Sequence, residues 1–141
     1  MATPRKVAIL AEEGYQDLEL FHPLLRLREE GIPVEVIGAE ADKTYLSQLE
    51  FPVIPDHGIA EVQAADFGAV IVTGGASVNR IVENERMIGF LREAAKNGAL
   101  LASISNGVKA FEKAGARPAV AVKNTDSLPE FCRALFQALR K

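Results

Sequence analysis

The chain has 141 residues, of which 48% are hydrophobic and 25% are charged, and its formal net charge is −3 at pH 7. This length suits one domain over residues 1–141, because a domain of this size buries roughly two thirds of the surface that its unfolded chain exposes. The acidic balance and the lack of a basic stripe argue against nucleic acid as a partner. The single cysteine excludes an internal disulfide, and no Cys and His have metal-ligand spacing, so we expect neither a metal nor another cofactor.

The first residues predict neither a leader nor an anchor. Basic residues precede the apolar run VAIL at 7–10, but this run has only four residues and acidic residues follow at once. A signal peptide needs roughly 7–15 apolar residues and a membrane-spanning helix about 20. We therefore expect a cytoplasmic protein without a membrane partner.

A strand, a helix and a second strand are predicted at the start of the chain. KVAIL at 6–10 is a short apolar run of strand-forming residues. From Asp17, the expected helix cap, apolar residues recur every three or four positions up to Gly31, which is typical of an amphipathic helix that ends at a glycine. PVEVIG at 33–38 predicts the next strand, and a unit of this kind is expected to be parallel and right-handed.

The middle of the chain begins irregularly and then becomes regular. Residues 39–66 predict an edge hairpin or excursion, followed by a short helical turn around AEVQAAD. GAVIVTGG at 68–75 is a strong strand that ends in paired glycines, and residues 77–97 predict a helix with a break near Asn84. GALLASI at 98–104 predicts another buried strand.

The last third predicts a helix at about 107–114, a strand at AVAVK and a final helix. The opening sequence TDSLPE offers Asp126 or Ser127 as the cap of that helix and places Pro129 in its first turn. Cys132 falls on the apolar face of this helix, so we interpret it as a core residue and not as a redox thiol.

Strands that alternate with helices and are nearly all continuously apolar predict an α/β three-layer sandwich. Its central sheet is expected to be mostly parallel, with helices on both faces. Ligands of such sheets bind at the carboxyl ends of the strands, near the topological switch point. The loops EEGYQD, TGGAS and SISNG would line that edge, and their amides could converge on one small polar or anionic group.

The order of these loops resembles the ThiJ/PfpI superfamily. Almost the whole chain takes part, in the segments KVAILAEEGYQDLELFHPLLRLREEG, FGAVIVTGG, LLASISNG and DSLPEFCRALFQAL. The resemblance implies a flavodoxin-like, class I glutamine amidotransferase-like fold and a homodimer. It also implies a shortened C-terminal half, because family members insert strands and a helix where this chain runs from Ala114 to Ala119. The site would then be shallower and more hydrated.

By the same resemblance, the reactive positions of the family hold different residues here. Members carry a cysteine at the turn after the strand, then a histidine and a glycine, and a glutamate after the first strand. The matching residues are Ser105, Asn106, Gly107 and Gln16, and Asn79 matches a further acidic residue of the protease-like members. Each non-glycine replacement keeps a hydrogen-bonding group of similar size and removes the ionisable one.

The paired glycines Gly74 and Gly75 have two interpretations. They could let the chain turn out of its strand, or they could take part in an oxyanion site that the amides of Gly75 and Asn106 would form by resemblance.

A serine at this position needs a base that the sequence does not locate. A thiol ionises near neutral pH at a helix N-terminus, whereas a serine hydroxyl depends on an adjacent base. The amides of Asn106 and Gln16 do not accept a proton near neutral pH. The pattern places neither His22 nor His57 beside Ser105, and each is interpreted as a surface or structural residue. Carboxylates of the first loop, at Glu12, Glu13 and Asp17, are better candidates for neighbours of the pocket.

Three hypotheses follow. The favoured one is a ThiJ/PfpI-like domain without cysteine-based catalysis, which acts in assembly or small-molecule binding. The second is a serine-dependent hydrolase of the peptidase, amidase or deglycase type that uses Ser105 and an unlocated base. The third is a carrier or sensor of a small polar metabolite, held in a neutral pocket formed by Gln16, Asn79, Ser105 and Asn106.

Overall fold

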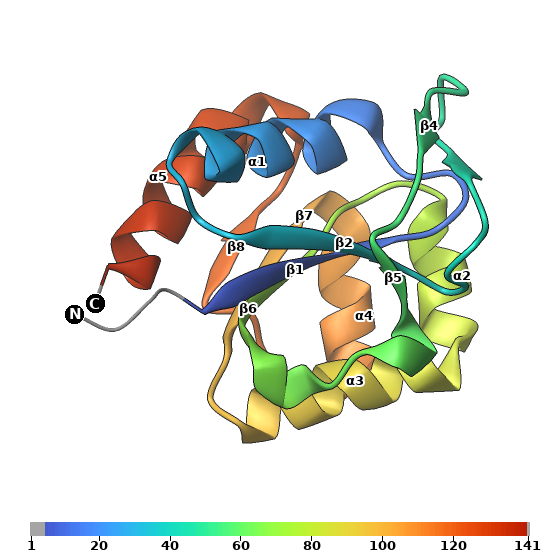
Figure 1. Cartoon of the computed structure of the whole chain (residues 1–141). Coiled ribbons are helices and arrows are strands. Elements are labelled where there is room, and N and C mark those ends of the chain that lie inside the picture. Colours follow the sequence, from blue (N-terminus) through green and yellow to red (C-terminus); the bar gives the residue numbers. More distant parts are fainter. Residues whose placement is uncertain (1–4, 141) are drawn as a thin grey trace.

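The structure is a computed structural model that describes residues 5–140. A central sheet lies between two layers of helices (Figure 1). The strands of the sheet, in spatial order, are β5 (His57–Gly58), β2 (Val34–Gly38), β1 (Lys6–Ala11), β6 (Phe67–Val72), β7 (Leu100–Ile104) and β8 (Val120–Val122). All five pairings between them are parallel, which confirms the predicted α/β, flavodoxin-like sheet.

Helices cover both faces of this sheet. Helices α1 (Asp17–Glu29) and α5 (Leu128–Leu139) lie on one face, and α2 (Ser77–Glu83), α3 (Glu85–Lys96) and α4 (Val108–Lys113) lie on the other (Figure 1). Alternate residues of each strand point to opposite faces, so Ile9 packs under α1 and α5 while Leu10 packs on the α3 side. Two apolar cores therefore explain why the strands are apolar throughout.

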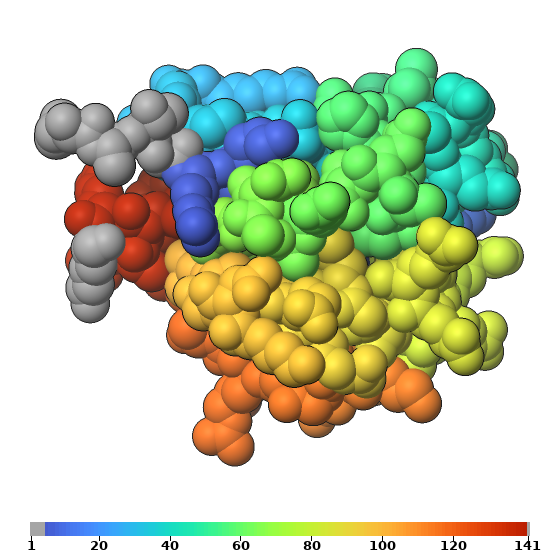
Figure 2. Space-filling view, turned by 60° about the horizontal axis from the view of Figure 1, so that its bottom comes forward, coloured from blue at the N-terminus to red at the C-terminus, as the bar shows by residue number. Residues whose placement is uncertain are grey.

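The irregular segment forms the predicted hairpin and edge. Strands β3 (Tyr45–Leu46) and β4 (Pro52–Val53) pair antiparallel, and β5 then extends the main sheet. Two 3-10 turns follow, at Ile59–Glu61 and Ala64–Asp66. Figure 2 shows this green segment against the yellow α3, and a hollow of about 520 Å³ lies between them.

The predicted cap of α1 is wrong, and that of α5 is right in position only. Gln16, not Asp17, caps α1, because its side chain accepts a hydrogen bond from the Glu19 amide at 2.8 Å. Asp17 instead accepts one hydrogen bond from the Ser47 hydroxyl and one from the Leu49 amide. At α5, Ser127 occupies the cap position without a side-chain capping bond, since its hydroxyl donates to Asn124.

Asp126 lies within the 3-10 turn Thr125–Ser127 and does not cap α5 either. Pro129 is in the first turn of α5, as predicted. The predicted helix break is confirmed at Asn84, which ends α2 and caps α3 by accepting from the amides of Arg86 and Met87. Cys132 is buried in the core, and this burial raises the pKa of its thiol.

Among residues 5–140, no helix combines the length and the apolar character needed to cross a membrane.

Gly107 packs against the backbone of Val72 at the end of β6, so Gly107→Ala tests this packing. A Cβ there would overlap the carbonyl oxygen of Val72, and we expect a loss of about 1–3 kcal/mol in the free energy of unfolding. In the control Gly89→Ala, the new Cβ meets no atom within 4 Å. Because alanine favours the helix more than glycine does, we expect the free energy of unfolding to rise by about 0.5–1 kcal/mol. Urea unfolding measures both, and equal stabilities would contradict this account.

Candidate functional site

Three loops meet at the carboxyl edge of the sheet. They follow β1, β6 and β7, which are neighbours in the sheet, so the chain places them side by side. Ser105 lies at the sharp turn between β7 and α4 and is half-buried. Its φ of 53° is left-handed, a conformation that costs a non-glycine residue roughly 1–3 kcal/mol. The surrounding structure must therefore hold Ser105 in place.

A buried carboxylate faces Ser105. Glu19, on α1, is only 2% exposed, and its Oε2 accepts hydrogen bonds from the Ser105 hydroxyl at 2.7 Å and from the Thr125 hydroxyl at 2.8 Å. Its other oxygen, Oε1, accepts from the Gly74 amide at 2.7 Å. Three donors thus satisfy a group that would be costly to bury alone. We call Glu19, Gly74, Ser105 and Thr125 the Glu19 cluster.

Neither Glu19 nor Thr125 was singled out from the sequence. The pattern of α1 gives little signal for Glu19, because Leu20, Leu24 and Leu27 mark the inward face and Glu19 only borders it. Thr125 has no comparable signal. It lies 106 positions from Glu19 in the chain, and only the fold brings the two together.

Asn106 is paired with the backbone of Gly75 at two points. Its Oδ1 accepts from the Gly75 amide at 2.9 Å, and its Nδ2 donates to the Gly75 carbonyl at 3.0 Å. The Gly75 amide, which the resemblance offered as an oxyanion donor, is therefore already bonded. The neighbouring Gly74 amide is bonded to Glu19.

Close packing and backbone shape account for both glycines. A Cβ at Gly74 would come within 2.6 Å of both the Glu19 carboxylate and the Ser105 Cβ. Gly75 has a φ of 119°, which strains any residue with a side chain. The turn interpretation of the paired glycines is thus sufficient to explain them.

The remaining sequence candidates lie around the Glu19 cluster without joining it. Gln16 caps α1 through its side chain and donates its own amide to the Gly74 carbonyl at 3.0 Å. Asn79 lies exposed on α2. The carboxylate of Glu12 accepts from the Glu13 amide, and that of Glu13 accepts from the Leu46 amide. These two carboxylates therefore stabilise the loop after β1 and its contact with the hairpin.

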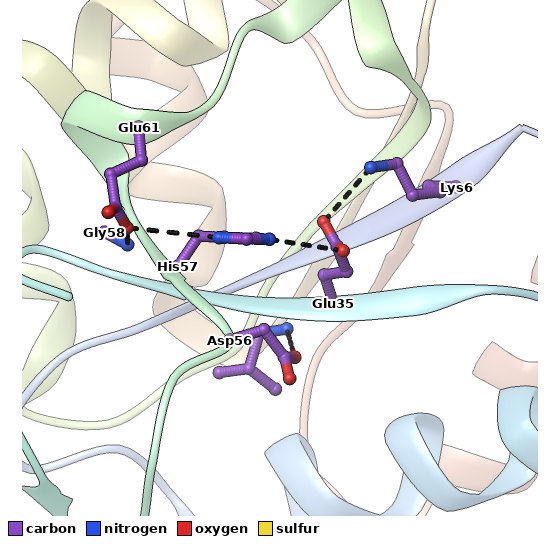
Figure 3. A network of polar contacts seen from close by, with 7 residues as sticks. Lys6, Glu35, Asp56, His57, Gly58 and Glu61 are labelled. Carbon is purple, nitrogen blue, oxygen red and sulfur yellow. Dashed lines mark hydrogen bonds and ion pairs between the residues drawn. The ribbon is translucent and has the colours of Figure 1, made fainter. Parts of the chain in front are cut away.

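The two histidines do not supply a base in the Glu19 cluster. Figure 3 shows His57 between two carboxylates at the edge of the sheet, with Nε2 3.5 Å from Glu35 and Nδ1 3.9 Å from Glu61. Lys6 also contacts Glu35, at 3.3 Å, so His57 belongs to a network that fastens the edge strand β5. His22 is half-buried on α1. In the described part of the chain, no three His, Cys, Asp or Glu residues are arranged to hold a metal.

Tyr15 fixes the loop that leads into α1. Its hydroxyl donates to the Phe51 carbonyl at 2.6 Å, and its backbone bridges to Ser47 on one side and to Gly75 on the other. Burial, together with the carboxylates of Asp17 and Glu13, raises the pKa of Tyr15 to about 12. The loop is thus held between the hairpin and the paired glycines.

Residues 5–122 match the profile of the DJ-1/PfpI family. An uncharacterized protein of Archaeoglobus fulgidus is 35% identical over 102 residues, which cover 72% of this chain and 60% of the relative. A deglycase of Thermococcus kodakarensis is 32% identical over 110 residues, covering 78% of this chain and 66% of the relative. This chain therefore spans between 60% and 66% of the length of these two curated relatives.

The crystal structure of DJ-1beta from Drosophila melanogaster shows the same fold. It superposes with a TM-score of 0.86 at 19% identity, over 96% of this chain and 90% of that chain.

Replacing Glu19 tests whether its carboxylate holds the edge together. Glu19→Leu leaves three donors without an acceptor, so we expect a loss of about 2–4 kcal/mol in the free energy of unfolding. Glu19→Gln should lose less, because its carbonyl still accepts from Gly74 and the two hydroxyls can rotate to accept from the new amide. Urea unfolding compares both with Glu112→Gln, an exposed control on α4. Equal losses for Leu and Gln would refute the acceptor role.

The raised pKa of Tyr15 predicts alkaline instability. A phenol whose pKa is higher in the folded than in the unfolded state contributes stability below pH 10, and that contribution is lost as the pH rises from 10 to about 12. Tyr15→Phe should flatten this part of the stability curve. Burial also raises the pKa of Tyr45, so a residual slope is expected. Thermal unfolding across this pH range measures the effect, and an unchanged slope in Tyr15→Phe would rule it out.

Proposed function

The chain belongs to the DJ-1/PfpI family, and on that premise we propose that it acts as a noncatalytic domain in assembly or small-molecule binding. The observation that carries this proposal is the two-point pairing of Asn106 with the Gly75 backbone. We propose a cytoplasmic location, a single domain over residues 1–141 and a homodimer as further parts of this role.

Acyl transfer and hydrolysis need a nucleophile, a base and free donors for the developing oxyanion. Of the two backbone amides that the resemblance offers as oxyanion donors, those of Gly75 and Asn106, the Gly75 amide donates to an acceptor of the chain itself, and so does the neighbouring Gly74 amide. The side chains of Asn106 and Gln16 are amides, so they cannot accept a proton near neutral pH, and both make internal hydrogen bonds. The Gly75 amide and the side chains of Asn106 and Gln16 are therefore engaged in holding the fold, which supports a role other than catalysis.

The same internal bonds favour assembly over capture of a metabolite. A neutral pocket formed by Gln16, Asn79, Ser105 and Asn106 would have to bind its ligand with groups that are already bonded, apart from Asn79. The hollow between the 3-10 turns and α3, by contrast, is lined by none of these four residues.

One observation favours a second candidate, a serine-dependent hydrolase. The Ser105 hydroxyl donates to Glu19 at 2.7 Å, within the reach of a general base. In that reaction, the hydroxyl proton would pass to Glu19 Oε2 while Oγ attacks a carbonyl carbon and the C=O electron pair moves onto the oxygen. Glu19 would return the proton to the leaving group as the C=O bond re-forms, and water would release the acyl group from Oγ by the same two steps. The deglycase of Thermococcus kodakarensis makes a hydrolase-like role worth testing here. The Asn106 side chain would have to leave Gly75 to free the Gly75 amide as an oxyanion donor.

Labelling with a serine-directed fluorophosphonate, read by intact mass, separates the two candidates. We expect no adduct on the wild type or on Ser105→Ala. A single adduct on the wild type that is absent from Ser105→Ala would overturn the noncatalytic proposal, and its loss in Glu19→Gln would identify the base. An adduct that forms only in Asn106→Ala would show that the pairing with Gly75 is what blocks reaction. A deglycase assay on glycated protein, with the Thermococcus relative as positive control, should show no turnover.

A further inference from the structure

Strand β8 forms one edge of the central sheet. It pairs with β7 on one side, and in the described part of the chain no strand lies on its other side. Backbone N–H and C=O groups alternate in direction along a strand, so part of β8 points these groups away from β7. Among residues 5–140, no backbone group outside β7 bonds to the backbone of β8. The outer side of β8 can therefore accept a further strand.

The opposite edge of the sheet is protected against such pairing. Strand β5 has only two residues, Pro55 lies just before it, and His57 is held between Glu35 and Glu61 (Figure 3). Short edge strands, prolines and charged side chains are the means by which natural sheets block unwanted pairing. Of the two edges, β8 is thus the one left open.

The chain around β8 is basic, although the protein as a whole is acidic. Residues 105–124, between β7 and the 3-10 turn before α5, carry four basic side chains and one acidic side chain, a net charge of +3 within a chain of net charge −3. In Figure 2 this orange segment stands at the lower edge of the molecule. All four basic residues are exposed: Lys109, Lys113, Arg117 and Lys123. None of them forms an ion pair with another residue of the range 5–140, so they are available to acidic groups of a partner.

The side chains of β8 define the kind of strand that fits beside it. Val120 is buried in the core beneath α5, and the half-buried Val122 packs against the same core. Ala121 points to the opposite face, where it is exposed. A strand added beside β8 continues both faces, so every second side chain would border the apolar core and the others would lie in solvent. Such a strand alternates apolar and polar residues.

We propose that the outer side of β8 binds an extended acidic segment of another protein, in which apolar and acidic residues alternate, as an additional strand of the sheet. This partner specifies the assembly role proposed above and rests on it. The backbone of the segment would pair with β8, and its apolar residues would lie beside Val120 and Val122. Its carboxylates would lie within reach of Arg117 and Lys123, which flank the strand.

The same charges disfavour a second copy of β8 as the occupant of this edge. Pairing of two β8 strands would bring Arg117 and Lys123 of each copy beside the basic residues of the other. Like charges on neighbouring strands destabilise their pairing. The charge therefore selects a partner strand of opposite sign.

Binding of a synthetic strand to the full chain tests the proposal. The probe is a fluorescein-labelled octapeptide of alternating valine and glutamate with blocked ends, and fluorescence anisotropy measures its dissociation constant. We expect saturable binding that weakens with added salt. One control peptide carries lysine in place of glutamate. Another keeps every glutamate but has proline in place of the two central valines, so it cannot present a continuous row of N–H groups. Neither control should bind.

Substitutions at β8 test the position of the peptide. Ala121→Glu and Lys123→Glu should each weaken binding about fivefold, because they remove attraction or add repulsion beside the glutamates, and Ala121→Lys should strengthen it by a similar factor. The control Arg28→Glu makes the same charge change as Lys123→Glu at an exposed position of α1, which packs over β1 and β2, and should bind as the wild type does. Circular dichroism and thermal unfolding check the fold of each variant, and Arg117→Glu serves if a variant at Ala121 unfolds.

Amide hydrogen exchange distinguishes an added strand from contact by charge alone. Hydrogen bonds to the peptide backbone should slow exchange in residues 119–123, while exchange in β5 at the opposite edge should not change. Protection confined to other segments would overturn the assignment of the surface to β8.

Absence of binding by the wild type up to about 1 mM peptide would also overturn the proposal. Equal binding of the proline-containing peptide would do the same, as would wild-type affinity in both Ala121→Glu and Lys123→Glu. The test is separate from that of Ser105. A fluorophosphonate adduct refutes the noncatalytic role whatever the peptide does, and failure of the peptide to bind refutes this surface whatever the labelling shows.

Discussion

The carboxylate of Glu19 holds the carboxyl edge of the sheet together. It is carried by α1, after β1, and it binds groups that follow β6, β7 and β8, the next strands across the sheet. Parallel strands all end at one edge, where the backbone turns away and leaves polar groups without partners from the sheet. One buried acceptor satisfies three of them. The left-handed backbone of Ser105 is held by the hydrogen bond of its hydroxyl to Glu19 and by the tight packing against Gly74.

Asn106 shows what a neutral side chain can do at such an edge. A primary amide carries a donor and an acceptor side by side, so it can pair with both the N–H and the C=O of one residue. An ionised carboxylate offers acceptors only and could not make both bonds. The pairing of Asn106 with Gly75 therefore adds a short piece of sheet-like bonding to two loops, and it closes the turn after β7 onto the turn after β6.

The elements of this fold could be predicted from the sequence, whereas its contacts could not. Continuous apolar runs such as 68–72 can be recognised as strands because a parallel strand is buried on both faces of its sheet. The helix break at Asn84 follows from local chemistry, since the side chain bonds amides two and three residues on. The sequence predicts Asp17 as the cap of α1, but Gln16 takes that role because the Asp17 carboxylate binds the distant Ser47 hydroxyl. Thr125 is brought to Glu19 only by the folding of the chain, so no local sequence pattern predicts this contact.

Tyr15 connects two parts of the molecule that have been described separately. Its backbone forms one β-bridge with Ser47 and another with Gly75, so it lies between the hairpin and the paired glycines. The Tyr15 backbone thus joins the hairpin directly to the Gly75 turn, to which Asn106 is bonded. By thermodynamic reciprocity, an occupant of one end that shifts Tyr15 changes affinity at the other end by the same factor as the reverse process does.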